Sequence, residues 1–136
     1  MLLNKEILIG IYGSQLRSAY SIIPDIALAI EGWVVNFTVN ALKVSDGTIL
    51  YWTTLQVDGN IDSSDFVENS LNGSVTIDSS NTGTITRTLA ENSIVEGNES
   101  FKLELRTDSI SGPIVAVSNT VVILKPFKLE IDTTLI

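Results

Sequence analysis

The chain has 136 residues, which is long enough for a single domain with an apolar core and no disulfide bonds. It contains no cysteine and no histidine, which excludes disulfides, thiolate metal sites and the serine–histidine catalytic pair. Sixteen acidic residues against eight basic residues give a formal net charge of −8. Because binding to phosphates requires clustered Lys and Arg, we expect no nucleic-acid partner.

Residues 1–23 differ from the rest of the chain, because their apolar residues follow no clear alternation. A signal peptide needs a basic start, a longer apolar run and a small-residue cleavage site, and Glu6 fits none of these. We therefore expect no export signal, and no stretch is long enough to predict a membrane span. The segment is predicted to be an N-terminal arm or an added edge strand, and an N-terminal strand of the same domain fits equally well.

Period-two alternation begins after Pro24, a residue that cannot donate a ladder hydrogen bond and biases its predecessor towards extended structure. Residues 26–30 alternate up to the turn signal Glu31–Gly32. Residues 33–40 follow as a predicted strand, with Trp33, Val35, Phe37 and Val39 on one face.

Turn chemistry divides the middle of the chain. Asp46–Gly47 is a strong turn signal, and residues 48–54 after it are typical of a strand. Residues 55–69 are acidic and are predicted to form a loop. Residues 73–77 and 83–89 flank a run of turn residues, and the pattern predicts that they form a hairpin.

The strongest strand signal lies in the second half of the stretch 94–107, where Phe101, Leu103 and Leu105 alternate with charged residues as far as Arg106. An acidic turn leads into this strand, which we expect to pair with or pack against everything upstream. Residues 114–124 predict one long strand or two, and residues 127–136 a short strand or tail. The short strands at about ten-residue spacing predict an all-β, antiparallel sandwich of about seven to nine strands over residues 24–124, with a C-terminal extension over 125–136.

An ordered series of motifs carries a family resemblance. It runs through Glu31–Gly32, the Asp-Gly-Thr-Ile-Leu-Tyr-Trp run from Asp46, the Ser-Asp-Phe triplet at Asp65, and the Glu-Gly-Asn-Glu-Ser-Phe run from Glu96. Together these residues resemble a Calx-beta domain, an immunoglobulin-like Greek-key sandwich, over roughly residues 24 to 124. The Tyr-Trp-Thr strand and the Phe-Lys-Leu-Glu-Leu-Arg-Thr strand are further similar to the variant in tail, fibre and other structural proteins of bacteriophages, including cyanophages.

The resemblance implies where Ca²⁺ ligands would lie, because calcium-binding members gather loop carboxylates at one end of the sandwich. The positions that match are Glu31, Asp65, Glu91, Asn92 and Glu96. Oxygen ligands of this kind suit Ca²⁺, which takes six to eight of them.

Two departures from the family oppose a calcium site. Asn92 is neutral where an aspartate is expected, and Lys125–Pro126–Phe127 replaces the run of aspartates that follows the last strand. A lysine at that place repels a dication directly. We therefore expect no cofactor, and we expect Glu31, Glu96 and Glu99 to accept backbone N–H bonds at the turns.

No pattern predicts an enzyme. Asp62, Asp65 and Glu68 provide carboxylates, but acids in one polar loop are usually solvated rather than a glycosidase pair. The aromatic residues Trp33, Tyr51, Trp52 and Phe101 fit core and interface packing better than a carbohydrate platform.

We therefore expect a structural protein of a phage virion, made without a signal peptide in the host cytoplasm, such as a capsid decoration, neck, tail or baseplate component. Its partners would be other virion proteins or further copies of itself, with no membrane involved. The expected assembly contacts are the apolar terminal residues Leu2, Leu3, Ile7, Phe127, Leu135 and Ile136. Two alternatives stay open: an adhesion or ligand-binding module for host glycans, and a calcium-responsive regulatory domain.

Overall fold

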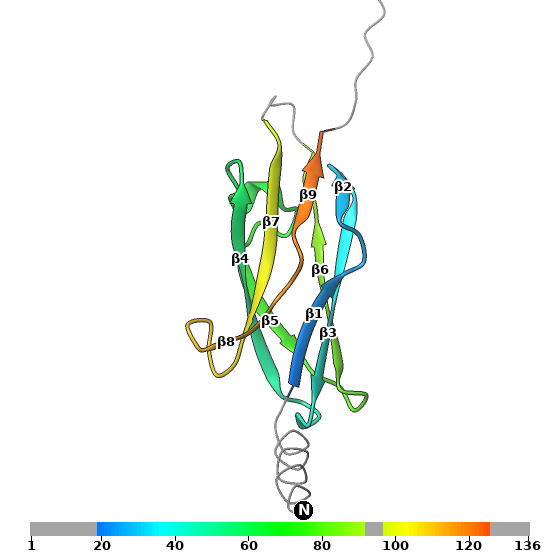
Figure 1. The fold of residues 1–136 in the computed structure, drawn as a ribbon, viewed down its shortest axis with the longest axis vertical. Helices are drawn as coiled ribbons and strands as arrows, with labels where there is room; N and C mark the ends of the chain where they lie inside the picture. The colour runs from blue at the N-terminus through cyan, green and yellow to red at the C-terminus, as the bar shows by residue number, and fades with distance from the viewer. Residues whose placement is uncertain (1–18, 92–96, 126–136) are drawn as a thin grey trace, which may run out of the picture.

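The computed structural model describes residues 19–91 and 97–125, which form nine strands and one short 3-10 helix (Figure 1). The strands are β1 (Ala19–Pro24), β2 (Leu28–Ile30), β3 (Val34–Leu42), β4 (Ile49–Asp58), β5 (Asn72–Thr76), β6 (Thr82–Thr88), β7 (Glu99–Arg106), β8 (Ile114–Val117) and β9 (Val121–Leu124). The helix η1 (Ser63–Asp65) lies in the connection between β4 and β5. In this part of the chain, no helix is long and apolar enough to cross a membrane.

Two sheets pack face to face, which confirms the predicted all-β sandwich. Sheet A has the order β1-β3-β6, and sheet B has the order β2-β9-β7-β4-β5 with β8 also paired to β7. The strand with the strongest sequence signal, β7, lies at the centre of sheet B between β4 and the two short strands β8 and β9. The break in residues 114–124 therefore separates two strands, and both of them pair with β7.

After Pro24, the chain passes from sheet A to sheet B. Strand β1 pairs antiparallel with β3 as far as Pro24, and β2 then pairs parallel with β9 in the other sheet. Because proline lacks an N–H donor, it suits the point where the chain leaves a ladder. Residues 19–23, which the sequence assigned to an arm or added edge strand, thus belong to the edge strand of sheet A, and the expected boundary at residue 24 falls inside β1.

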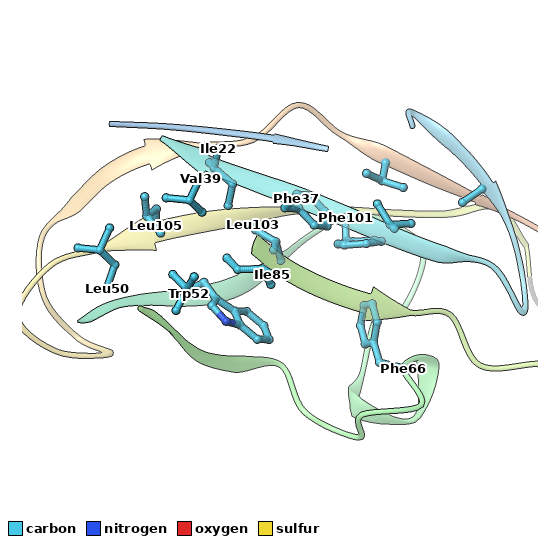
Figure 2. Close-up of a cluster of buried hydrophobic side chains, with 14 of the residues drawn as sticks. Ile22, Phe37, Val39, Leu50, Trp52, Phe66, Ile85, Phe101, Leu103 and Leu105 are labelled. Carbon is cyan, nitrogen blue, oxygen red and sulfur yellow. The ribbon is translucent and has the colours of Figure 1, made fainter. Parts of the chain in front are cut away.

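The core lies between the two sheets and is built by alternating residues (Figure 2). Phe101, Leu103 and Leu105 of β7 are fully buried, as their alternation predicts. Phe37 of β3 lies opposite, with its ring centroid 6.1 Å from that of Phe101. The ring of Phe66 meets Phe101 edge-on at 5.1 Å, so the β4–β5 connection contributes to the same core.

The predicted hairpin is wrong. Strand β5 pairs with β4 in sheet B, whereas β6 pairs with β3 in sheet A. The turn between β5 and β6 therefore crosses from one sheet to the other, and the Asp78 side chain accepts hydrogen bonds from the backbone N–H groups of Ser80 and Thr82. Turn residues show where a chain reverses, but they do not show which strand it pairs with afterwards.

Two smaller expectations also differ from the structure. Strand β4 continues to Asp58, so the predicted loop over residues 55–69 begins only after that residue. Trp33 was placed on the apolar face of its strand, but it precedes β3 in a turn and is 49% exposed.

Candidate functional site

Three charged residues meet at the end of the sandwich shown at the top of Figure 1, which we call the loop end. Glu31 lies in the turn between β2 and β3, Glu99 is the first residue of β7, and Lys125 directly follows β9. The sheet brings them together, because the Glu31 N–H donates to the Leu124 carbonyl at 3.0 Å and Glu99 pairs with Ile123 across the ladder.

The Lys125 ammonium group bridges the two carboxylates. Its Nζ atom bonds Glu31 Oε2 and lies 3.3 Å from Glu99 Oε1. The Glu31 and Glu99 side chains are only 3% and 2% exposed, whereas that of Lys125 is 23% exposed. Buried carboxylates need a counter-charge, and here the chain itself supplies one.

The other predicted ligand positions are used differently or lie outside the described residues. Asp65 is buried, and its Oδ2 accepts the backbone N–H of Asp62 at 2.8 Å as part of a capping box around η1. Glu91 is exposed, and its side chain lies over Gly32, where an added Cβ would come within 2.9 Å of Glu91 Oε1. Asn92 and Glu96 fall in the undescribed residues.

The described residues do not fit a calcium site of the kind that the resemblance implies. A dication between Glu31 and Glu99 would have to displace Lys125. The carboxylate of Asp65 is engaged in its own loop, and no three acidic residues of residues 19–91 and 97–125 gather into a ligand cluster. The bridge of Glu31, Lys125 and Glu99 is therefore an electrostatic lock within the protein.

Arg87 is a fully buried cation, and no pattern described in the sequence had indicated a role for it. It lies on the inward face of β6 with 1% exposure. Its guanidinium carbon lies 4.6 Å from the ring centroid of Trp52 and 4.1 Å from that of Phe66. The alternation in β6 could have revealed it, because Arg87 is two residues from the buried Ile85.

The guanidinium of Arg87 also ties the β4–β5 connection to sheet A. Nη2 donates to the Ser70 carbonyl, Nη1 donates to Ser70 Oγ at 3.4 Å, and Glu68 Oε1 lies 3.6 Å from Nη1. Burial lowers the pKa of Arg87 to about 10, and the charge of Glu68 opposes that shift. The group therefore stays charged at neutral pH.

No protein-family model matches the sequence. A comparison with proteins of known function finds no similar sequence. Among solved structures, the fold is similar to the apo form of the Calx CBD1 domain, with a TM-score of 0.51 and 13% identity over 80% of this chain and 99% of that one. The Calx CBD2 domain also matches, at a TM-score of 0.44 and 14% identity over 77% of this chain and 85% of that one. At this identity the first match shows the fold alone, and the protein has a Calx-beta-like sandwich.

Proposed function

We propose that the protein is a non-catalytic structural module that acts through protein–protein assembly as a component of a phage virion. The observation that carries the assembly role is the Lys125 bridge. The family resemblance implies carboxylate ligands for Ca²⁺ at this end of the sandwich, whereas here the ammonium group of Lys125 neutralises the two buried carboxylates. The module then needs no bound cation to neutralise the carboxylates at its loop end, and it can act as a rigid body.

The position within a virion rests on the sequence. The strands around Tyr51–Trp52 and Phe101–Arg106 resemble those of Calx-beta domains in phage tail and other structural proteins. A Calx-beta-like sandwich fits a capsid decoration, neck, tail or baseplate component equally well. The assembly contacts expected at both termini lie outside the described residues. In Figure 1, β1 begins and β9 ends at opposite ends of the sandwich.

Light scattering on the full chain and on a shortened variant tests the assembly role. The shortened variant should keep residues 19–125, because residues 19–23 belong to β1 and Lys125 closes the loop end. A full-length oligomer that becomes a folded monomer on shortening supports terminal contacts. A folded monomer in both cases contradicts self-assembly through the termini.

The virion role needs its own measurement. An antibody against the chain should label purified particles of the phage whose genome encodes the sequence, as seen by electron microscopy. Particles without label, in a lysate that contains the protein, would overturn the virion role and leave the fold and the loop-end lock unaffected.

A specific observation favours one alternative, a surface module that binds host glycans. Trp33 is 49% exposed and lies at the loop end, where an aromatic ring beside polar groups can stack on a sugar. Trp33→Ala should then abolish binding on a glycan array while the melting temperature stays unchanged. An array without signal for the unaltered protein excludes this function.

A further inference from the structure

Three places in the sequence have an Asp or Asn followed by Gly, the pair of residues that most readily closes into a succinimide ring. They are Asp46–Gly47, Asp58–Gly59 and Asn72–Gly73. Glycine favours this reaction because it has no side chain to shield its main-chain nitrogen, which attacks the side chain of the residue before it. The three pairs differ in what the fold does with that nitrogen.

The fold ties two of these glycines to other parts of the main chain. The Gly47 N–H lies in the turn between β3 and β4 and donates to the Ile77 carbonyl at 2.7 Å. Gly73 lies within β5, where it pairs with Trp52 of β4. A glycine that is fixed in this way cannot turn its nitrogen towards the preceding side chain without breaking main-chain contacts.

The Asp58–Gly59 pair is arranged differently. The Gly59 N–H donates to Oδ1 of Asp58 itself at 3.0 Å, which holds the nitrogen beside the carboxyl group that it would attack. Gly59 has a φ of +72°, and the ladder between β4 and β7 shifts register just before it, so β4 ends in an irregular stretch. Exposure does not separate this pair from Asp46–Gly47, because all four residues are exposed.

We infer that Asp58 is a site of spontaneous isoaspartate formation. The Gly59 nitrogen bonds to Cγ of Asp58, and one carboxyl oxygen leaves as water with the amide proton and one proton from solvent. Water then cleaves one of the two carbonyl–nitrogen bonds of the succinimide. Cleavage of the original peptide bond leaves a main chain that runs through Cβ and Cγ, and the new α-carboxyl group returns the proton. The reaction needs only water, and the inference does not depend on the proposed assembly function.

The modification would act directly on the loop end, where β4 ends beside the start of β7 (Figure 1). A Cβ atom at Gly59 would lie 2.6 Å from the Asn98 carbonyl oxygen and 2.9 Å from Cγ of Glu99. The main chain is thus packed closely against the carboxylate residue that binds Lys125. Isoaspartate inserts one more methylene group into this main chain, so Glu99 must move and its contact with Lys125 should weaken.

Peptide mapping of the full chain, aged in warm neutral buffer made with heavy-oxygen water, tests the site. Each hydrolysed succinimide takes up one heavy oxygen atom, and electron-transfer fragmentation distinguishes isoaspartate from aspartate. Asp46–Gly47 is the internal control, since it has the same two residues but a nitrogen that is bonded elsewhere. A second sample aged in denaturant shows how the two pairs react without the fold.

In the folded chain, isoaspartate should accumulate at position 58 about ten-fold faster than at position 46. In denaturant the two rates should become similar. Equal rates in the folded chain, or no isoaspartate at position 58, would overturn the site. A difference that persists unchanged in denaturant would overturn the argument from the fold.

Two matched variants test the effect on the loop end. Asp58→Glu and Asp46→Glu each keep the carboxylate but lengthen the side chain, which then no longer closes the five-membered ring. On ageing, the melting temperature of the unaltered chain and of Asp46→Glu should fall, while that of Asp58→Glu should stay constant. An equal fall in all three proteins would show that isomerisation at position 58 does not loosen the loop end.

Discussion

The partly buried Lys125 holds the loop end and the fully buried Arg87 holds the β4–β5 connection, and the two cations are stabilised in different ways. Lys125 is neutralised by two carboxylates. Glu31 comes from the turn between β2 and β3, and Glu99 from the start of β7. Arg87 lies over the rings of Trp52 and Phe66, and its counter-charge among the described residues is the partly exposed Glu68.

The difference follows from the two head groups. An ammonium group is a compact, strongly hydrated charge, so burying it requires anions close by. A guanidinium group is planar and weakly hydrated, so it can stack on aromatic faces and donate to a backbone carbonyl. The loop end is therefore held by charge pairing, and the β4–β5 connection is held mainly by stacking and packing. Substitutions should separate these two mechanisms.

Arg87→Ala should produce the largest loss of stability. It removes a fully buried side chain from between two rings, and we expect a cost of about 4 kcal/mol in the free energy of unfolding. Because Arg87 has a pKa of about 10, its side chain stays charged between pH 5 and pH 8. The loss in the free energy of unfolding should therefore be the same across this range. Chemical denaturation across that range measures the effect.

Arg87→Met is the matched control for that change. It keeps most of the volume and removes a guanidinium whose Nε atom is buried without a hydrogen-bond partner among the described residues. We expect a cost of about 1 kcal/mol or less. If Arg87→Met costs as much as Arg87→Ala, charge and not packing holds the connection.

Lys125→Met should cost about 3 kcal/mol, because it leaves two buried carboxylates facing each other without a cation. The double variant Glu31→Gln with Lys125→Met should recover part of this loss, since it removes one of the two charges. Denaturation of the two single variants and the double variant gives the coupling energy. Strictly additive losses would show that Lys125 and Glu31 do not stabilise each other.

Gly73→Ala tests the packing of the Trp52 ring, which contacts Arg87. A Cβ atom at Gly73 would lie 2.6 Å from Cζ2 of Trp52, so the indole ring must shift away from its present position. We expect a cost of about 2 kcal/mol, as for other overpacked cores. Asn72→Ala on the exposed neighbour is the control, and a loss as small as that of the control would show that Trp52 moves freely.

Asp78→Asn should have a smaller effect that depends on pH. Backbone N–H groups of Thr82 and Ser80 lower the pKa of Asp78 below its usual value of 3.8. Its contribution to stability is therefore present above pH 3.8 and is lost as the pH falls through the lower pKa of the folded state. The melting temperature of the variant should lie slightly below that of the unaltered protein at pH 6, and the gap should close in acid.

Calcium should have the smallest effect. Because Lys125 lies between Glu31 and Glu99, adding Ca²⁺ should move the melting temperature no more than adding the same concentration of Mg²⁺. A saturable upward shift with Ca²⁺ alone would contradict the lock and restore the calcium site implied by the family resemblance.

Most of the local structure follows from the order of the residues alone. The alternation of Phe101, Leu103 and Leu105 predicted both a strand and its buried face, because period-two patterning matches the two sides of a strand. From the sequence, Lys125 was also expected to oppose a dication at the loop end. The Asp78 turn was recognised from its composition, because turn residues act through bonds to their own backbone.

The contacts between distant segments could not be predicted from local patterns. Pairing of β5 with β4 and of β6 with β3 depends on how two sheets share one core, and the turn between these strands is compatible with a hairpin as well. Packing of the two sheets also brings Lys125 next to Glu31 and Glu99. It likewise places Arg87 against Trp52 and Phe66. Local patterns specify the state of each segment, whereas contacts between segments far apart in sequence follow from the packing of the whole sandwich.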